Sequence, residues 1–251
     1  MSNLDKSIEL YNEAQLYDDI MWWKKDDINF WLKIIKKFRM KKILELCCGT
    51  GRIGNELINE DLDYHGIDIS KSFIDFFKNK NKNQENIFCK DARSFNNNHK
   101  YDLIFIGFNS ISHILKNIDL QNMLKCVKSH MHENSLFIID TFVPHADFLY
   151  KDPSFKKDIL DFINTQNKKK LTIYETANYN SENEINNIRW EFFESKNKLF
   201  YYDFKMRMYF PDTLFSILAE LNYSIEYIYG DYDLNAFNEK SEKQIYLCKN
   251  K

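Results

Sequence analysis

The stretch KKILELCCGTGRIGNEL, Lys41–Leu57, decides the fold of this 251-residue chain. An apolar run, Ile43–Leu46, leads to Gly49-Thr50-Gly51, and a helical pattern follows. A buried strand that ends in glycines and continues into a helix is typical of nucleotide-binding α/β sheets. Gly49–Gly54 also fits the G-x-G-x-x-G pattern of NAD-dependent oxidoreductases. The stretch therefore predicts a nucleotide cofactor and leaves its identity open.

Helix and strand patterns alternate around this stretch. Because the strands follow one another in βα units of about thirty residues or less, they favour a parallel sheet with right-handed crossovers. We predict an α/β fold with a doubly wound, mostly parallel sheet. Helical patterns cover 27–38, 52–60, 71–80 and 119–131, and strand patterns cover 43–46, 64–70, 86–92, 101–108 and 135–142.

The sequence pattern changes between Lys168 and Phe210, where three strand patterns follow one another without a helix. This predicts an antiparallel three-strand flap inserted into the α/β domain. We expect residues 1–167 to form an N-terminal cap and the cofactor-binding core, residues 168–210 to form the flap, and residues 211–251 to return to the core sheet. The last two strands are expected to pair at one edge, within a single domain overall.

Composition narrows the class of protein. A net charge of -2 gives no basic field for nucleic acid, and neither a signal peptide nor a membrane-spanning run is evident, so we expect a cytoplasmic protein. The five cysteines are odd in number and lack the spacing of a metal site. We expect reduced, buried thiols and no metal.

Glu45 distinguishes between the possible cofactors. It lies near the strand end just before the glycines. An acid there disfavours the pyrophosphate of NAD and favours a cationic ligand. Together, the residues E-L-C-C-G-T-G resemble the first motif of class I S-adenosylmethionine (SAM)-dependent methyltransferases, whose cofactor carries an ammonium and a sulfonium. The resemblance implies a Rossmann-like sheet of seven strands, with SAM as cofactor and S-adenosylhomocysteine as product.

The resemblance also implies which residues bind the cofactor. Asp68 stands where the family binds both ribose hydroxyls, and Asp91 stands where an acid faces the adenine amino group, although either Asp is equally suited to a turn or cap. Cys47 replaces the first glycine of the motif, which requires a negative φ at this position. The full expected set is Glu45, Cys47, Gly49, Thr50, Gly51, Arg52, Asp68, Ile69, Asp91, Ala92 and Phe108.

The later segments resemble a narrower group. The patterns in 101–115 and 130–145 look like the methyltransferases that act on small molecules, and the inserted flap looks like that of sugar-amine and amino-acid N-methyltransferases. Glu133-Asn134 stands where the family has a Gly-Gly turn, and Asn can adopt the left-handed conformation. A further resemblance is to the enzymes that dimethylate the N-terminal arginine of plantazolicin-type peptides.

Methyl transfer mainly requires alignment of a nucleophile and exclusion of water, so no catalytic dyad is expected. Asn109 is the candidate for positioning and His113 the candidate base, with a locally bonded histidine as the alternative. The segment around Tyr17 resembles the cap over the cofactor, so Tyr17 is a third catalytic candidate. Trp22 and Trp23 either wall the pocket, or one packs on the core and the other covers the sheet edge.

An aromatic pocket with acids would suit a cationic substrate through stacking and cation–π contacts. Tyr202 in the flap is one candidate substrate residue. The acids Asp26, Asp158 and Asp161 are others, or they are solvated helix faces.

The leading hypothesis is an N-methyltransferase of a small molecule or modified peptide in natural product biosynthesis, either a monomer or a homodimer. An O-methyltransferase, an NAD-dependent oxidoreductase and a non-catalytic SAM-binding protein are the alternatives.

Overall fold

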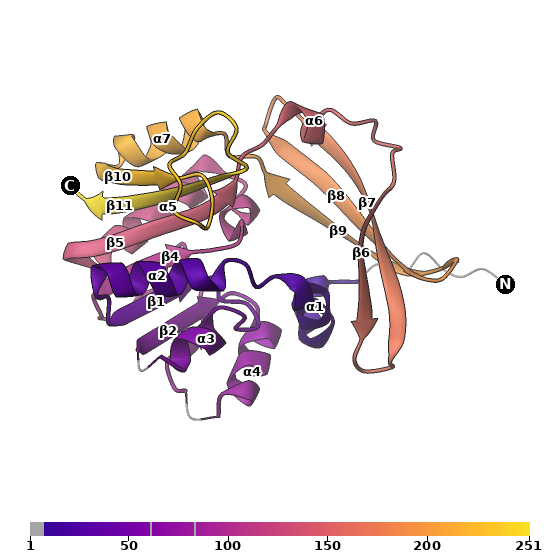
Figure 1. Cartoon of the computed structure of the whole chain (residues 1–251), viewed down its shortest axis with the longest axis horizontal. Helices are drawn as coiled ribbons and strands as arrows, with labels where there is room; N and C mark the ends of the chain where they lie inside the picture. The colour runs from indigo at the N-terminus through magenta and orange to yellow at the C-terminus, as the bar shows by residue number, and fades with distance from the viewer. Residues whose placement is uncertain (1–7, 61, 83) are drawn as a thin grey trace. The chain divides into compact units, whose positions relative to one another are not determined.

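A computed structural model describes residues 8–60, 62–82 and 84–251, and the chain divides into two compact units (Figure 1). The α/β unit comprises residues 25–143 and 209–251, and the antiparallel unit comprises the described part of residues 1–24 together with residues 144–208. The first seven residues of the expected cap lie outside the described residues.

The α/β unit contains a seven-stranded sheet in the order β10-β11-β5-β4-β1-β2-β3. The five strands from β1 to β5 pair in parallel, whereas β11 pairs antiparallel with both β5 and β10. The expected fold class and the terminal strand pair at one edge are confirmed. The strands are β1 (Lys42–Leu46), β2 (Asp63–Asp68), β3 (Ile87–Cys89), β4 (Tyr101–Ile106), β5 (Met131–Phe142), β10 (Tyr223–Tyr229) and β11 (Lys243–Asn250).

Helices cover both faces of this sheet, because alternate residues of each buried strand point to opposite sides. Leu44 and Leu46 of β1 belong to the cluster that includes α5 (Asn117–Ser129) and α7 (Pro211–Glu220). Ile43 belongs to the cluster that includes α2 (Ile28–Phe38), α3 (Gly54–Ile58) and α4 (Lys71–Lys80). The sheet is therefore doubly wound, and its strand order reverses between β1 and β4.

Local signals set the helix ends. The Oγ of Ser70 accepts a hydrogen bond from the Phe73 N–H and caps α4. Pro211 occupies the first turn of α7, where the missing N–H costs nothing. Arg39 ends α2 in the left-handed conformation, with its N–H donating to the carbonyls of Ile35 and Lys36.

The antiparallel unit contains a four-stranded sheet: the three strands predicted within residues 168–210 are present, and a fourth strand precedes them. The extra strand is β6 (Lys157–Asn164), where Phe162 is buried while Asp158 and Asp161 are exposed. Asp158 and Asp161 lie on this strand, so the alternative that they belong to a solvated helix face was wrong. Exposed charges on an edge strand resemble those of a solvated helix. The other strands are β7 (Lys169–Asn180), β8 (Ile185–Glu194) and β9 (Asn197–Arg207).

Short helices complete this unit: η1 (Leu10–Asn12), α1 (Ala14–Ile20), η2 (Met21–Trp23) and α6 (Ala146–Leu149). Leu16 and Ile20 of α1 share an apolar cluster with Ile173 and Phe192 of the sheet. The carboxylate of Asp19 accepts hydrogen bonds from the N–H and hydroxyl of Thr165, at 2.7 and 2.8 Å. These contacts fix α1 to the hairpin between β6 and β7.

Two details of the α/β unit differ from expectation. Glu133 and Asn134 lie inside β5 and not in a turn, because the strand bulges where Tyr101 pairs with Met131 and Leu103 with Leu136. Cys89 is exposed, whereas Cys48 and Cys248 are buried as expected. No helix within the described ranges has the length and apolar character needed to span a membrane.

Candidate active site

The loop between β1 and α3 is built on left-handed residues. Cys47, Gly49 and Gly51 have φ of 56°, 57° and 87°. The expectation of a negative φ at Cys47 was wrong, because the chain turns immediately after Leu46 and Cys47 takes the conformation that glycine would supply. A side chain at Gly51 would lie 2.3 Å from the Phe77 ring, so only glycine fits above α4. Thr50 is buried in the same turn.

Glu45 is buried at the carboxyl end of β1, with an exposed fraction of 4%. Its Oε2 accepts a hydrogen bond from the Tyr64 hydroxyl at 2.6 Å. Burial raises the pKa of the Glu45 carboxyl to about 8, although the hydrogen bond from Tyr64 and the charge of Arg52 oppose the shift. The carboxyl is therefore poised to ionise when a cation approaches.

Asp68 lies at the end of β2, beside the same loop. Its Oδ2 accepts the Gly49 N–H at 2.9 Å, and its Oδ1 accepts the Ser70 N–H at 2.8 Å. Burial raises the pKa of Asp68, and these backbone donors counteract that effect. The next residue, Ile69, is 66% exposed, so an apolar surface lies next to the carboxylate.

Arg52 follows the glycines and forms a bidentate ion pair with Asp27. Its Nη1 and Nη2 lie 2.6 and 2.7 Å from the two carboxylate oxygens of Asp27, which is fully buried. Asp26, the acid expected from the sequence, is exposed, and the burial of the neighbouring Asp27 was not predicted. The only sequence feature that pointed to Asp27 was its position directly before a predicted helix.

Asp91 follows β3, and its carboxylate is held by Arg93. Arg93 Nε and Nη2 lie 2.9 and 2.6 Å from Asp91 Oδ1 and Oδ2. This hydrogen bonding lowers the pKa of Asp91. Ala92 is half-buried between the two.

The turn after β4 contains two consecutive left-handed residues, Phe108 and Asn109, with φ of 48° and 60°. The fully buried Asp140 of β5 accepts the Phe108 N–H at 2.9 Å, and Asn109 Oδ1 accepts the Phe142 N–H at 2.9 Å. Such strain persists only where neighbours enforce it, and it often marks a functional site. Asn109 thus holds the backbone of this turn, and His113 is exposed on η3 (Ser110–His113), the short helix that follows it.

Asp140 was missed by the sequence analysis. Asp140 follows the apolar residues of β5, as Asp68 follows those of β2. This shared position is the sequence signal that could have identified Asp140. Its Oδ2 also accepts the Tyr232 hydroxyl at 2.9 Å, and Lys243 Nζ lies 3.7 Å from Oδ1. Among the described residues, Asp140 Oδ1 accepts no hydrogen bond.

The remaining candidates lie in the antiparallel unit. Tyr17 on α1 is half-buried, with its ring 6.1 Å from that of Tyr11. Trp22 and Trp23 are 59% and 48% exposed, so neither packs in a core. Tyr202 belongs to the apolar cluster of this unit, and burial raises its pKa to about 12.

Asp158 and Asp161 are exposed on β6. Asp161 accepts the Thr172 hydroxyl at 2.6 Å and pairs with Lys170. These contacts within the sheet account for Asp161 without a ligand.

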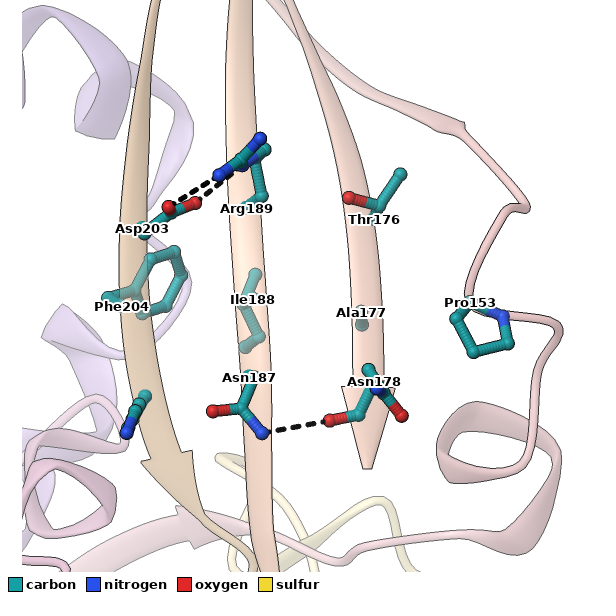
Figure 2. A pocket seen from close by; sticks show the side chains of 10 residues that line it. Pro153, Thr176, Ala177, Asn178, Asn187, Ile188, Arg189, Asp203 and Phe204 are labelled. Carbon is teal, nitrogen blue, oxygen red and sulfur yellow. Dashed lines mark hydrogen bonds and ion pairs between the residues drawn. The ribbon is translucent and has the colours of Figure 1, made fainter. Parts of the chain in front are cut away.

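A hollow of about 370 Å³, lined by both polar and apolar side chains, lies on the sheet of this unit (Figure 2). One row across the strands consists of Thr176, Arg189 and Asp203, and a second consists of Asn178, Asn187 and Lys205. Arg189 and Asp203 form a bidentate pair, with both distances 2.7 Å (Figure 2). None of the residues expected from the sequence to form the site lines this hollow.

Part of the α/β unit matches a known protein family. Residues 44–137, which include Glu45, Asp68, Asp91 and Asn109, match the family described as "Methyltransferase domain". The match covers β2, β3 and β4 and parts of β1 and β5 of the α/β unit. The chain is thus an enzyme of the methyltransferase class. None of the curated protein sequences matches it significantly.

Solved structures of methyltransferases share the fold of the whole chain. A SAM-dependent methyltransferase from Clostridium acetobutylicum is 21% identical, with 96% of this chain and 99% of that chain covered and a TM-score of 0.75. The sugar N-methyltransferase KedS8 from Streptoalloteichus is 12% identical, with 100% and 97% covered and a TM-score of 0.73. The glycopeptide N-methyltransferase MtfA is 12% identical, with 91% and 88% covered and a TM-score of 0.62. The likeness in fold therefore extends over both units of this chain.

Proposed function

We propose that this enzyme transfers a methyl group from SAM to an amine of a small molecule or modified peptide. The observation that carries the proposal is the charge arrangement at the glycine loop. Glu45 lies two residues before the loop, and Asp68 accepts a hydrogen bond from the Gly49 N–H. Arg52, which follows the loop, is paired with Asp27. The loop thus presents carboxyl groups to a ligand.

These carboxyl groups suit SAM as a ligand. A carboxylate stabilises an ammonium or sulfonium nearby, and the ionisation of Glu45 would be favoured by such a cation. Each oxygen of Asp68 that accepts a backbone N–H retains a lone pair, so the carboxylate suits the two hydroxyls of a ribose. The exposed side chain of Ile69 offers an apolar surface for the adenine ring.

The same set does not fit a dinucleotide. A diphosphate would meet carboxyl groups, while Arg52 is engaged with Asp27. The helix after the glycines, α3, has only five residues, so its dipole offers little compensation. The G-x-G-x-x-G pattern is therefore better explained by a cationic cofactor.

When bound, SAM supplies an electrophilic methyl group. The task of the chain is to orient the acceptor and to remove a proton from it. The hydrogen bonds from the Phe108 N–H to Asp140 and from the Phe142 N–H to Asn109 keep the turn after β4 rigid. We assign to His113, exposed on the helix after this turn, the role of the base that receives the amine proton.

An amine acceptor is favoured by two of the structural neighbours, since KedS8 is a sugar N-methyltransferase and MtfA a glycopeptide N-methyltransferase. The aromatic residues Tyr17, Trp22 and Trp23 and the acids Asp26 and Asp158 remain the proposed acceptor-side residues. Their chemistry suits a cationic substrate.

The test is an acceptor screen with matched pairs, analysed by mass spectrometry. Each pair differs only at the proposed nucleophile: an amino sugar and its hydroxyl analogue, or a peptide with an N-terminal arginine and its Nα-acetylated form. We expect a gain of methyl mass on the amine member alone. Methylation of the hydroxyl member with the amine analogue inert would contradict the proposed acceptor class.

A further inference from the structure

A buried tyrosine connects β2 to the acid of the glycine loop. Tyr64 pairs in register with Ile43 of β1, and its hydroxyl reaches Glu45, two residues further along that strand. The hydroxyl donates to Glu45 Oε2 at 2.6 Å, and the Tyr64 residue is only 2% exposed. Burial raises the pKa of this hydroxyl, so it remains protonated and able to donate. The hydrogen bond restricts rotation of the Glu45 carboxyl.

Two glycines provide the space for this side chain. A Cβ on Gly54 would lie 2.4 Å from the Tyr64 hydroxyl oxygen, and a Cβ on Gly66 would lie 2.9 Å from it. Real Cβ atoms do not approach an oxygen so closely without displacement. Gly54 is the last glycine of the G-x-G-x-x-G pattern. The missing side chain at Gly54 leaves room for the Tyr64 hydroxyl beside Glu45, and also for the Phe77 ring, which would lie 2.6 Å from the same Cβ.

We propose that Tyr64 is a positioning residue, whose hydroxyl holds the Glu45 carboxylate in the orientation that receives the ammonium group of the cofactor. The inference rests on the proposed function, because it requires that a cationic cofactor bind at the glycine loop. Tyr64 itself contacts the acid and acts through it. Its removal should therefore weaken binding only of those ligands that carry the amino-acid portion of the cofactor.

Two ligands separate this role from a general structural one. S-adenosylhomocysteine contains the ammonium, whereas 5′-methylthioadenosine has the same nucleoside without the amino-acid portion. Calorimetric titration of the Tyr64→Phe variant should give an affinity for S-adenosylhomocysteine about tenfold lower than that of the unmodified protein. The affinity for 5′-methylthioadenosine should change less than about twofold, since no contact to the nucleoside is lost. Equal losses for both ligands, or no loss for either, would overturn the proposal.

Tyr101→Phe is the matched control. Tyr101 is equally buried in the same sheet, and its hydroxyl lies 3.2 Å from His65 Nδ1 and 2.5 Å from Asn97 Nδ2, with no contact to Glu45. This variant should bind both ligands like the unmodified protein. In a Glu45→Gln background, Tyr64→Phe should add little further loss of S-adenosylhomocysteine affinity, because the two residues act as one unit. Additive losses would contradict the positioning role.

Gly66→Ala provides a second route if Tyr64→Phe fails to fold, since the new methyl group would lie 2.9 Å from the Tyr64 hydroxyl oxygen and 3.0 Å from Cys48 Sγ, so that the hydroxyl must shift. The same ligand-selective loss is expected, and unchanged affinity for S-adenosylhomocysteine would count against the proposal. Failure of the unmodified protein to bind either ligand would overturn the proposed function itself. Normal binding by the unmodified protein and by Tyr64→Phe alike would overturn only the role of Tyr64.

Discussion

Arg52 and Asp27 form a bidentate ion pair in which the carboxylate is fully buried, with N–O distances of 2.6 and 2.7 Å. The pair connects the start of α2 to the residue that follows the glycine loop. Replacement of Arg52 would remove the bidentate guanidinium from a fully buried carboxylate, which is far more costly than the loss of a surface contact.

Arg52→Met is therefore expected to lower the free energy of unfolding by about 3 kcal/mol. Arg189→Met is the matched control, because Arg189 and Asp203 form a pair of the same geometry whose side chains are 40% and 49% exposed. Its cost should not exceed about 1 kcal/mol. Urea unfolding followed by circular dichroism measures both, and equal costs would show that burial of Asp27 does not determine the energy of the pair.

Cys47 holds a left-handed conformation, with φ of 56°, that a branched side chain tolerates poorly. Cys47→Val should be less stable than Cys47→Gly by about 1–2 kcal/mol, because glycine adopts this conformation without a steric cost. Thermal unfolding of the two variants side by side checks the prediction. Equal melting temperatures would indicate that the loop does not need a left-handed residue here.

Ionisation of Glu45 should make stability depend on pH. Its folded-state pKa of about 8 lies above the ordinary value of 4.5, so the folded state holds a proton that the unfolded state releases. This contribution is fully present below about pH 4.5 and is lost as pH rises towards 8, with a slope of up to about 1.4 kcal/mol per pH unit.

Glu45→Gln should remove that slope, so the variant gains stability over the unmodified protein as pH rises from about 5 to 8. Urea unfolding across this range provides the measurement. Glu56→Gln, which alters an exposed residue of α3, should stay within about 0.5 kcal/mol of the unmodified protein at every pH. Parallel curves for Glu45→Gln and the unmodified protein would refute a proton held by Glu45.

Asp68→Asn tests the assignment of the ribose site. Removal of the charge should weaken S-adenosylhomocysteine binding about tenfold to a hundredfold, since hydrogen bonds to charged groups each contribute about 1.5–3 kcal/mol. Asp63→Asn changes the first residue of the same strand, at the end opposite the glycine loop, and should have little effect on binding. Unchanged affinity in the Asp68 variant would remove this residue from the site.

Most of the fold followed from the sequence, because the α/β core repeats strong periodic signals. The expected helix over 71–80 coincides with α4, and Glu45 and Asp68 lie at neighbouring strand ends as parallel pairing requires. Strand β6 was missed because its exposed Lys157, Asp158 and Asp161 obscure the alternation of an edge strand.

The details of the site were harder to predict. Asp26 and Asp27 are adjacent, and a shift of one residue in the start of α2 would decide which of them is buried. The left-handed Cys47 depends on a single backbone torsion. Tyr64 has the sequence character of any strand tyrosine, and only its distance from Glu45 reveals its role.

The central claim is that the glycine loop binds a sulfonium cofactor and not a dinucleotide. Calorimetric titration of the purified protein with S-adenosylhomocysteine and, separately, with NADH tests it most directly. The charge arrangement of Glu45, Asp68 and the Asp27–Arg52 pair predicts binding of S-adenosylhomocysteine alone. Binding of NADH without S-adenosylhomocysteine would contradict the account.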